Sequence, residues 1–389
     1  MSTIVISIDE SISEVEGKYY GDNVCYDIVK RYADNFDHII LITRMHHILP
    51  GQIEKHHVNL PWNNINFVGV PFFNSIRELK NHYREIDHIV SRAVLGCDIA
   101  LVRSPSLLGF MILRKCKKIP FALEVVANPY EMYKGYAGLR KVQALMMHFA
   151  QKHYCKMAVA LAFVTKKSQQ KIYERNKHKE NNTYYSSIEL KKDFFSDIPV
   201  KQDFFSNRDL PLRITHVANV IVGNIKGHKE VLEVAAKIKQ LGKDVEVIFA
   251  GTGPDEDHYK KYAAELGIKA TFMGFVDKQQ LHNILQHSDF FLFPSKSEGL
   301  PKVLIEAMAV SVPCIASNVG GIPELLPPDN VFDSYDVDGM SNRIIELSSN
   351  KELYLENARF MYNTALEYES SVLAKRRVAF YHQLGSLKH

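Results

Sequence analysis

The sequence predicts an α/β protein built from two domains, each a doubly wound parallel sheet. Two observations predict this fold. Apolar strand patterns alternate with amphipathic helix patterns along the chain, and the strands are apolar throughout, as in parallel sheets covered on both faces. The alternation stops over residues 177–211, a polar stretch with two prolines, and then restarts. A chain of 389 residues suits two domains of ordinary size.

The first half supplies the elements of one domain. The apolar runs predict strands at residues 3–8, 37–43, 66–70, 98–102, 121–126 and 158–164, and a short strand at 183–185. The 3.6-residue periodicity predicts helices at residues 22–32, 76–95, 106–116 and 139–156.

The second half repeats the alternation. Strands are expected at residues 213–217, 245–250, 270–273, 290–293 and 313–317, and helices at 229–241, 257–266, 278–287, 301–310 and 322–325. Two closing helices are expected at 351–368 and 371–384. We expect a first domain at residues 1–205, a second at 206–370, and a final helix, residues 371–389, that crosses back to the first. In such sheets, ligands bind beyond the carboxyl ends of the strands.

The composition narrows the possible functions and locations. Apolar residues make up 46% and charged residues 24%, which is typical of a soluble globular protein. A net charge of +4 is too small to indicate nucleic-acid binding. The five cysteines are scattered and are expected to be free thiols. The first residues look like a strand and not a signal peptide, and the longest uncharged apolar run, 157–165, is too short to span a bilayer. We therefore expect a cytoplasmic protein, either free or peripheral on the cytosolic membrane face.

The most informative stretch follows the apolar run Phe290–Phe293. It reads Ser-Lys-Ser-Glu-Gly-Leu-Pro-Lys-Val-Leu-Ile-Glu-Ala-Met over residues 295–308, a strand, a short turn and a helix start. Free N–H groups and the helix dipole at such a start favour a phosphate. Glu298 and Glu306 cannot bind that phosphate because like charges repel, but they can accept hydrogen bonds from hydroxyls. The pattern indicates a nucleotide-sugar site.

This Glu-x7-Glu element resembles that of the retaining glycosyltransferases of family 4, which have the GT-B fold. Further motifs of that family occur in its order over residues 213–324: Lys226-Gly227, 249–254, 271–276 and 313–324. The resemblance implies two Rossmann-like domains facing a cleft. It also implies a retaining, metal-independent enzyme with no cofactor. Such an enzyme moves a sugar from a UDP- or GDP-sugar to a hydroxyl of a glycan or lipid-linked acceptor, here in bacterial surface polysaccharide synthesis.

The same resemblance assigns roles to residues. Glu298 would lie at the donor sugar and Lys226 at the diphosphate as the catalytic residues, and Glu306 would hold the nucleotide ribose. The implied donor-binding residues are Gly21, Asn219, Gly253, Phe275, Val276, Gly299, Leu300, Pro301 and Glu306. Four of these residues have an ordinary alternative: a solvated helix charge for Glu306, a helix-dipole charge for Glu298, a surface lysine for Lys226, and a plain turn before an Asp22 cap for Gly21.

The chain departs from the family pattern at two places. The usual arginine five residues before the lysine is replaced by Ile221, and Asn219 stands in a longer loop, so Lys226 is left as the one fixed cation. The histidine that many relatives carry after the strand matching 121–126 is missing. Arg103, Asn128 and Glu131 are then candidates on the acceptor side.

Two acidic pairs, at 255–257 and 336–338, superficially resemble Asp-x-Asp metal sites. Both precede helices, so we interpret both as helix caps and expect no metal site. Residues 139–156 mix basic and apolar side chains, a pattern that fits either contact with an anionic membrane or packing on a sheet. Two alternative functions stay open: a nucleotide-sugar epimerase of GT-B fold, and a non-catalytic nucleotide-sugar-binding subunit. The sequence does not name the sugar, the acceptor or the linkage.

Overall fold

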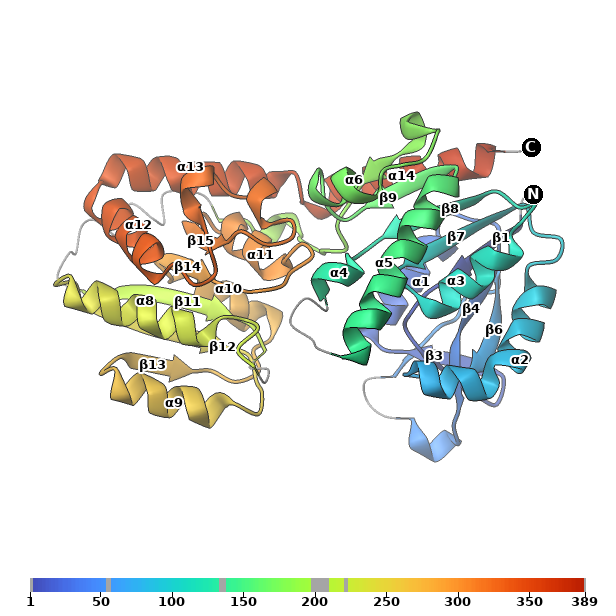
Figure 1. Cartoon of the computed structure of the whole chain (residues 1–389), viewed down its shortest axis with the longest axis horizontal. Coiled ribbons are helices and arrows are strands. Elements are labelled where there is room, and N and C mark those ends of the chain that lie inside the picture. Colours follow the sequence, from blue (N-terminus) through green and yellow to red (C-terminus); the bar gives the residue numbers. More distant parts are fainter. Residues whose placement is uncertain (1–2, 54–56, 133–137, 197–209, 220–222, 388–389) are drawn as a thin grey trace. The chain divides into compact units, whose positions relative to one another are not determined.

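The chain forms two compact units in a computed structural model (Figure 1). The structure describes residues 3–53, 57–132, 138–196, 210–219 and 223–387. Unit 1 comprises Met1–Val164, Gln169–Tyr185 and Lys375–His389, and unit 2 comprises Thr165–Ser168 and Ser186–Ala374. The chain therefore enters unit 1 again at its end. The domain boundary expected at 205/206 lies outside the described residues.

Unit 1 is built on a mostly parallel sheet of order β10-β9-β8-β7-β1-β4-β2-β3-β5, with β6 paired to β4. The strands are β1 Thr3–Ser7, β2 Ile12–Val15, β3 Lys18–Gly21, β4 His38–His47, β5 Val58–Asn59, β6 Ile65–Pro71, β7 Ile99–Ser104, β8 Phe121–Val125, β9 Ala160–Phe163 and β10 Thr183–Tyr184. The helices are α1 Asn23–Ala33, α2 Ile76–Ala93, α3 Leu107–Lys115, α4 Pro129–Met132, α5 Leu139–Met157, α6 Ser168–Tyr173 and α14 Ser370–Ser386.

One part of this sheet was not foreseen. β2 and β3 form an antiparallel hairpin between β1 and α1, and β3 also pairs antiparallel with β5. The hairpin turns at Glu16 and Gly17, both with positive φ (49° and 77°), which matches the right-handed twist of the flanking strands. The prediction of a purely parallel sheet was therefore wrong at this edge, because strands of four residues carry too little periodicity to be recognised.

Unit 2 contains a six-stranded sheet of order β13-β12-β11-β14-β15-β16, in which every neighbouring pair is parallel. The strands are β11 Leu212–Val217, β12 Val245–Ala250, β13 Lys269–Phe272, β14 Phe290–Phe293, β15 Cys314–Ser317 and β16 Val331–Phe332. The helices are α8 His228–Gln240, α9 Glu256–Glu265, α10 Lys278–Gln286, α11 Lys302–Ala309, α12 Val337–Ser349 and α13 Lys351–Leu366. Apolar side chains of α8, α9 and α12 pack with the strands in one core.

Helix boundaries in unit 2 differ slightly from the prediction. Pro301 is the N-cap of α11 and not its first residue, and the helix expected at 322–325 is a 3₁₀ turn, Ile322–Glu324. Asp336 caps α12 as predicted, accepting from the Gly339 N–H. Asp255 is the N-cap residue of α9, but its side chain accepts no hydrogen bond from the helix N–H groups. The interpretation of Asp255 as a side-chain cap was therefore wrong.

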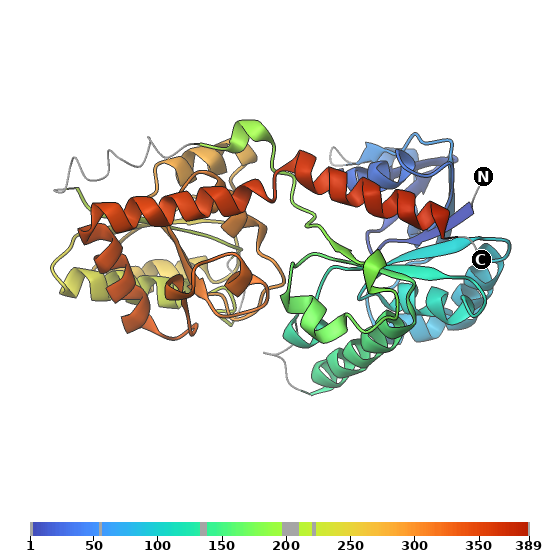
Figure 2. The ribbon, with the colours of Figure 1, turned by 90° about the horizontal axis from the view of Figure 1, so that it is seen from above.

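A buried carboxylate joins both ends of the chain in unit 1. Leu123 and Val125 of β8 belong to the core with α2, α3 and α5, so strand alternation turns Glu124 to the opposite face. There its oxygens accept from the hydroxyls of Tyr32 (2.6 Å), Tyr185 (2.6 Å) and Tyr381 (2.8 Å) and lie 3.4 Å from Arg103. Tyr32 is on α1 and Tyr381 on α14, which Figure 2 shows lying along unit 1.

The environment of Glu124 stabilises its charged form. Burial alone would raise the pKa of this carboxyl, but the Arg103 guanidinium and the three tyrosine hydroxyls hold it below its ordinary value of 4.5. A group whose folded-state pKa is lowered stabilises the fold above its unfolded pKa and loses that contribution as the pH falls through the folded pKa.

We predict that Glu124→Ala destabilises unit 1 by about 3–5 kcal/mol, because Arg103 and three tyrosine hydroxyls then remain buried without their hydrogen-bond acceptor. Tyr381→Phe removes one charge-assisted hydrogen bond and should cost about 1.5–3 kcal/mol. Urea unfolding measures both changes. Asp34→Asn, which breaks the exposed Lys30–Asp34 pair, is the control and should change stability by less than about 1 kcal/mol. The gap between wild type and Glu124→Gln should shrink below pH 4.5; a gap independent of pH would contradict this account.

Candidate functional site

A cavity of about 450 Å³ opens in unit 2 at the carboxyl ends of the strands. This is where parallel α/β sheets place their ligands, because the loops after successive strands meet there. Its lining combines apolar and polar groups: Val217, Ala218, Asn219, Lys226, Ala250, Gly251, Phe275, Val276, Leu281, Phe293, Glu298, Pro301, Lys302 and Val303. Six of the residues singled out from the sequence are among them: Asn219, Lys226, Phe275, Val276, Glu298 and Pro301.

The two residues predicted to be catalytic contact each other. Lys226 Nζ lies 2.6 Å from Glu298 Oε1, although the residues are 72 positions apart in the sequence. Both side chains are largely buried, with exposed fractions of 25% and 11%. Ser295 Oγ donates to the same Glu298 oxygen at 2.7 Å. An ion pair in this setting fixes a cation and a carboxylate side by side at the cavity wall.

The loop that carries Glu298 depends on a glycine. Gly320 has φ +55°, and a Cβ there would lie 2.1 Å from the Glu298 carbonyl oxygen. The next residue, Gly321, donates its N–H to the Gly299 carbonyl at 2.6 Å. The glycine pair in the 313–324 motif therefore lets the loop at 298–299 approach the turn after β15, which explains why these two motifs occur together.

Glu306 lies on α11, one turn beyond the cavity-lining residues Lys302 and Val303. It is half-buried and accepts no hydrogen bond from another described residue. Burial raises the pKa of this carboxyl, although Lys278 and Lys302 act in the opposite direction. A partly buried carboxylate that accepts no hydrogen bond from the described residues can accept one from a ligand hydroxyl.

The remaining predicted donor-binding residues lie in three places. Gly299 and Leu300 follow Glu298 in the loop before α11, and Gly253 lies between β12 and α9. Gly21 is the last residue of β3 in unit 1, next to Asp22, which accepts from the Cys25 N–H at 2.7 Å as the cap of α1. Ile221, which stands in place of the family's arginine, lies outside the described residues.

Sequence reasoning missed one cation. Lys302, the first residue of α11, is exposed and lines the cavity together with Lys226. The prediction left Lys226 as the one fixed cation in place of the family's two, and Lys302 adds an exposed positive charge at the same cavity. Its place at a helix start could have been read from Pro301.

The three acceptor-side candidates all lie in unit 1. Arg103, at the end of β7, is 14% exposed and paired with Glu124. Asn128 is buried and accepts from the Tyr173 hydroxyl at 2.7 Å and from the Tyr130 N–H at 3.1 Å. Glu131 lies on the short helix α4. Arg103 and Asn128 are thus engaged in internal contacts. In the parts of the chain that the structure describes, no cluster of three or more His, Cys, Asp or Glu could hold a metal ion.

Comparison with known proteins agrees with this geometry. Residues 206–364 match the protein family described as glycosyl transferases group 1. The chain is 26% identical to protein CapJ of Staphylococcus aureus over 390 residues, covering 95% of each protein. It is 30% identical over 131 residues to the GDP-mannose-dependent monoacylated alpha-(1-6)-phosphatidylinositol monomannoside mannosyltransferase of Corynebacterium glutamicum, covering 31% of this chain and 34% of that one.

Solved structures share the fold. Sucrose-phosphate synthase from Thermosynechococcus elongatus superposes with a TM-score of 0.70 at 15% identity, covering 99% of this chain and 100% of that one. Two Rossmann-like units and this likeness identify the fold as GT-B. The family match supports a glycosyltransferase.

We predict that Lys226→Ala lowers the transfer rate by about 100- to 1000-fold, as for removal of one preorganised donor to a developing charge. Asn219→Ala should cost much less, because a neutral donor stabilises negative charge more weakly than a cation does. Lys302→Ala should also cost less, since its side chain is exposed. Rates are measured at saturating donor. Retained activity in Lys226→Ala, with loss in either of the other variants, would place the phosphate contact elsewhere.

Proposed function

We propose that the protein is a retaining, metal-independent glycosyltransferase of the family 4 type. It moves a sugar from a UDP- or GDP-sugar to a hydroxyl of a glycan or lipid-linked acceptor in bacterial surface polysaccharide synthesis. The observation that carries the proposal is the Lys226–Glu298 pair at the wall of a cavity beside the start of α11. An epimerase or a non-catalytic binding subunit has no such specific observation in its favour.

Different residues in and beside the cavity can bind different parts of a nucleotide sugar. Phe275, Val276, Leu281 and Phe293 offer apolar surface for a base. Glu306 accepts from ribose hydroxyls and Glu298 from the donor sugar. Lys226 and the free N–H groups at the start of α11 face the diphosphate, whose negative charge grows as the glycosidic bond breaks. In front-face attack, a diphosphate oxygen takes the proton of the acceptor hydroxyl, which needs no protein nucleophile.

A pH titration of nucleotide binding tests this arrangement. UDP and GDP affinities are measured by calorimetry for wild type, Glu306→Ala and Glu306→Gln. We expect Glu306→Ala to lose about 1–3 kcal/mol of binding. Because the hydroxyls need the charged carboxylate, wild-type affinity should fall as the pH drops through the raised pKa of Glu306, whereas Glu306→Gln should lack this fall. Equal affinities and equal pH profiles would remove Glu306 from the site.

Turnover assays then separate the candidate functions. Sugar transfer to an acceptor supports the proposal, inversion at C2 of the sugar supports an epimerase, and binding alone supports a non-catalytic subunit. Transfer should survive EDTA. Complete loss with EDTA, restored by manganese or magnesium, would refute the metal-independent mechanism.

A lipid-linked acceptor would bring the protein to a membrane surface. In the described parts of the chain, no helix has the length and apolar content needed to cross a bilayer. The helix α5 does expose Val142 (54%), Met146 (64%) and Phe149 (64%) at a spacing that places them on one face. Lys141 and Lys156 are exposed on the same helix. This combination of apolar and basic groups fits the surface of an anionic bilayer.

We predict that the protein binds vesicles of anionic phospholipid more tightly than vesicles of zwitterionic lipid, and less tightly at high salt. A Met146→Glu/Phe149→Glu double variant should lose at least about tenfold in vesicle affinity, since each buried apolar side chain contributes roughly 1.5–3 kcal/mol. Leu95→Glu changes a side chain that is 75% exposed elsewhere on unit 1 and serves as the control. Co-sedimentation that is equal for both variants and wild type would exclude this face.

A further inference from the structure

Two loops bring Lys226 and Glu298 together. One, residues 224–227, precedes α8, and the other, residues 294–298, follows β14. The Lys296 N–H donates to the Ile225 carbonyl at 2.8 Å, and Ser295 Oγ, whose hydroxyl donates to Glu298, lies 3.3 Å from the same oxygen. The backbone of each loop is therefore held by the other, and a displacement of either would change the ion pair.

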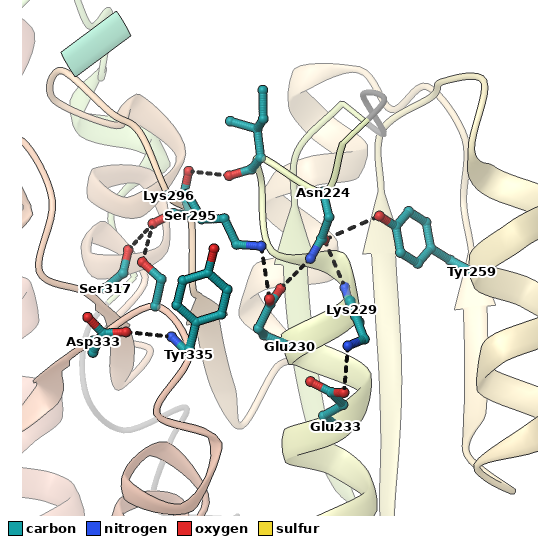
Figure 3. Close-up of polar contacts among 12 residues, drawn as sticks. Asn224, Lys229, Glu230, Glu233, Tyr259, Ser295, Lys296, Ser317, Asp333 and Tyr335 are labelled. Atoms are coloured by element: carbon teal, nitrogen blue, oxygen red, sulfur yellow. Dashed lines mark hydrogen bonds and ion pairs between the residues drawn. The ribbon is translucent and has the colours of Figure 1, made fainter. Parts of the chain in front are cut away.

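A buried carboxylate lies beneath both loops. Glu230, in the first turn of α8, is 4% exposed. It accepts from Asn224 Nδ2 at 2.7 Å and pairs with Lys296 Nζ at 3.0 Å (Figure 3). Glu230 thus binds one residue of each loop. It is not among the residues that line the cavity.

The path of the first loop is unusual at both ends. Asn224 has φ +52°, a left-handed conformation in which asparagine is enriched among the residues other than glycine. Its Oδ1 accepts from the Lys229 N–H at 3.1 Å and from the Tyr259 hydroxyl at 3.2 Å (Figure 3). Gly227 has φ +82°, and a Cβ there would lie 2.4 Å from the Pro294 carbonyl oxygen. The close approach of the two loops at this point therefore requires glycine at position 227.

We propose that Glu230 is a positioning residue for the Lys226–Glu298 pair. Through Asn224 and Lys296 it fixes the two loops relative to each other, and so the 2.6 Å separation of Lys226 Nζ and Glu298 Oε1. The proposal rests on the proposed function, in which this pair acts on charge that develops during transfer. A displaced pair then lowers turnover more than substrate affinity, because the lost interaction belongs to the transition state.

The chain offers a matched control on the same helix. Glu233, about one turn beyond Glu230, accepts from the Tyr262 hydroxyl at 3.0 Å and pairs with Lys229 Nζ at 3.2 Å. These side-chain partners lie on α9 and α8, outside both loops. Glu233→Gln therefore removes a hydrogen-bonded carboxylate from the same helix, one that is more exposed (29%) than Glu230 (4%), without touching the loop junction (Figure 3).

Steady-state kinetics give the first test. Glu230→Gln should lower kcat by about 10- to 100-fold with KM changed by less than about twofold, as for a small misplacement of catalytic groups. Glu233→Gln should retain both constants. Lys296→Met should reproduce the loss. The kcat of the Glu230→Gln/Lys296→Met double variant should be no lower than that of the more impaired single variant, because both substitutions act through one contact. Unchanged kcat in Glu230→Gln, or additive losses in the double variant, would overturn the proposal.

A substrate-free measurement separates this proposal from the proposed function. Reductive ¹³C-methylation labels the lysines, and the Lys226 resonance is assigned by its disappearance in Lys226→Arg. It should move in Glu230→Gln and in Lys296→Met but not in Glu233→Gln. If no nucleotide sugar is turned over, the proposed function fails while a moved resonance still supports the positioning. A Lys226 resonance unmoved in both loop variants refutes the positioning whatever the turnover.

Discussion

A carboxylate withdrawn from water has to be neutralised by the protein, and this constraint organises both units. Glu124 is satisfied by three tyrosine hydroxyls and Arg103, Glu298 by Lys226 and Ser295, and Glu230 by Lys296 and Asn224. In each case, at least one partner comes from a segment distant in the sequence, so the charge ties those segments together. Losing a single partner leaves a charge that the interior cannot solvate.

Glu306 differs from these carboxylates in a way that bears on ligand binding. It is also shielded from water, and its raised pKa reflects that burial, yet no described residue donates a hydrogen bond to it. The other three are complete in the absence of a ligand. On the proposed function, ribose hydroxyls donate the hydrogen bonds that the described residues do not provide to Glu306. Glu306 thus awaits donors from a substrate, whereas Glu298, the other carboxylate that the proposed function assigns to the site, is already paired with Lys226.

The sequence allowed the repeating strands and helices to be predicted because each carries its own local periodicity. The strand Val245–Ala250 matches its prediction residue for residue, and most other elements differ by one or two positions. The sequence could not indicate which side chains distant in the sequence contact each other in the fold. Nothing near Glu124 in the sequence points to Tyr381, and nothing near Glu230 points to Lys296. The hairpin of β2 and β3 was missed because its strands are short and partly polar. Lys302 was missed because the motif that contains it was interpreted through its two carboxylates, Glu298 and Glu306.

The division of the chain has a consequence for its synthesis. Most of unit 1 precedes unit 2 in the chain, but its last helix, from Lys375 onward, is synthesised after unit 2. Until Tyr381 emerges, Glu124 lacks one of its donors, and the sheet face that α14 covers is open to solvent. The usual order, in which the N-terminal domain completes its fold during translation, is therefore reversed here. Unit 2 can therefore complete its fold before unit 1 receives α14.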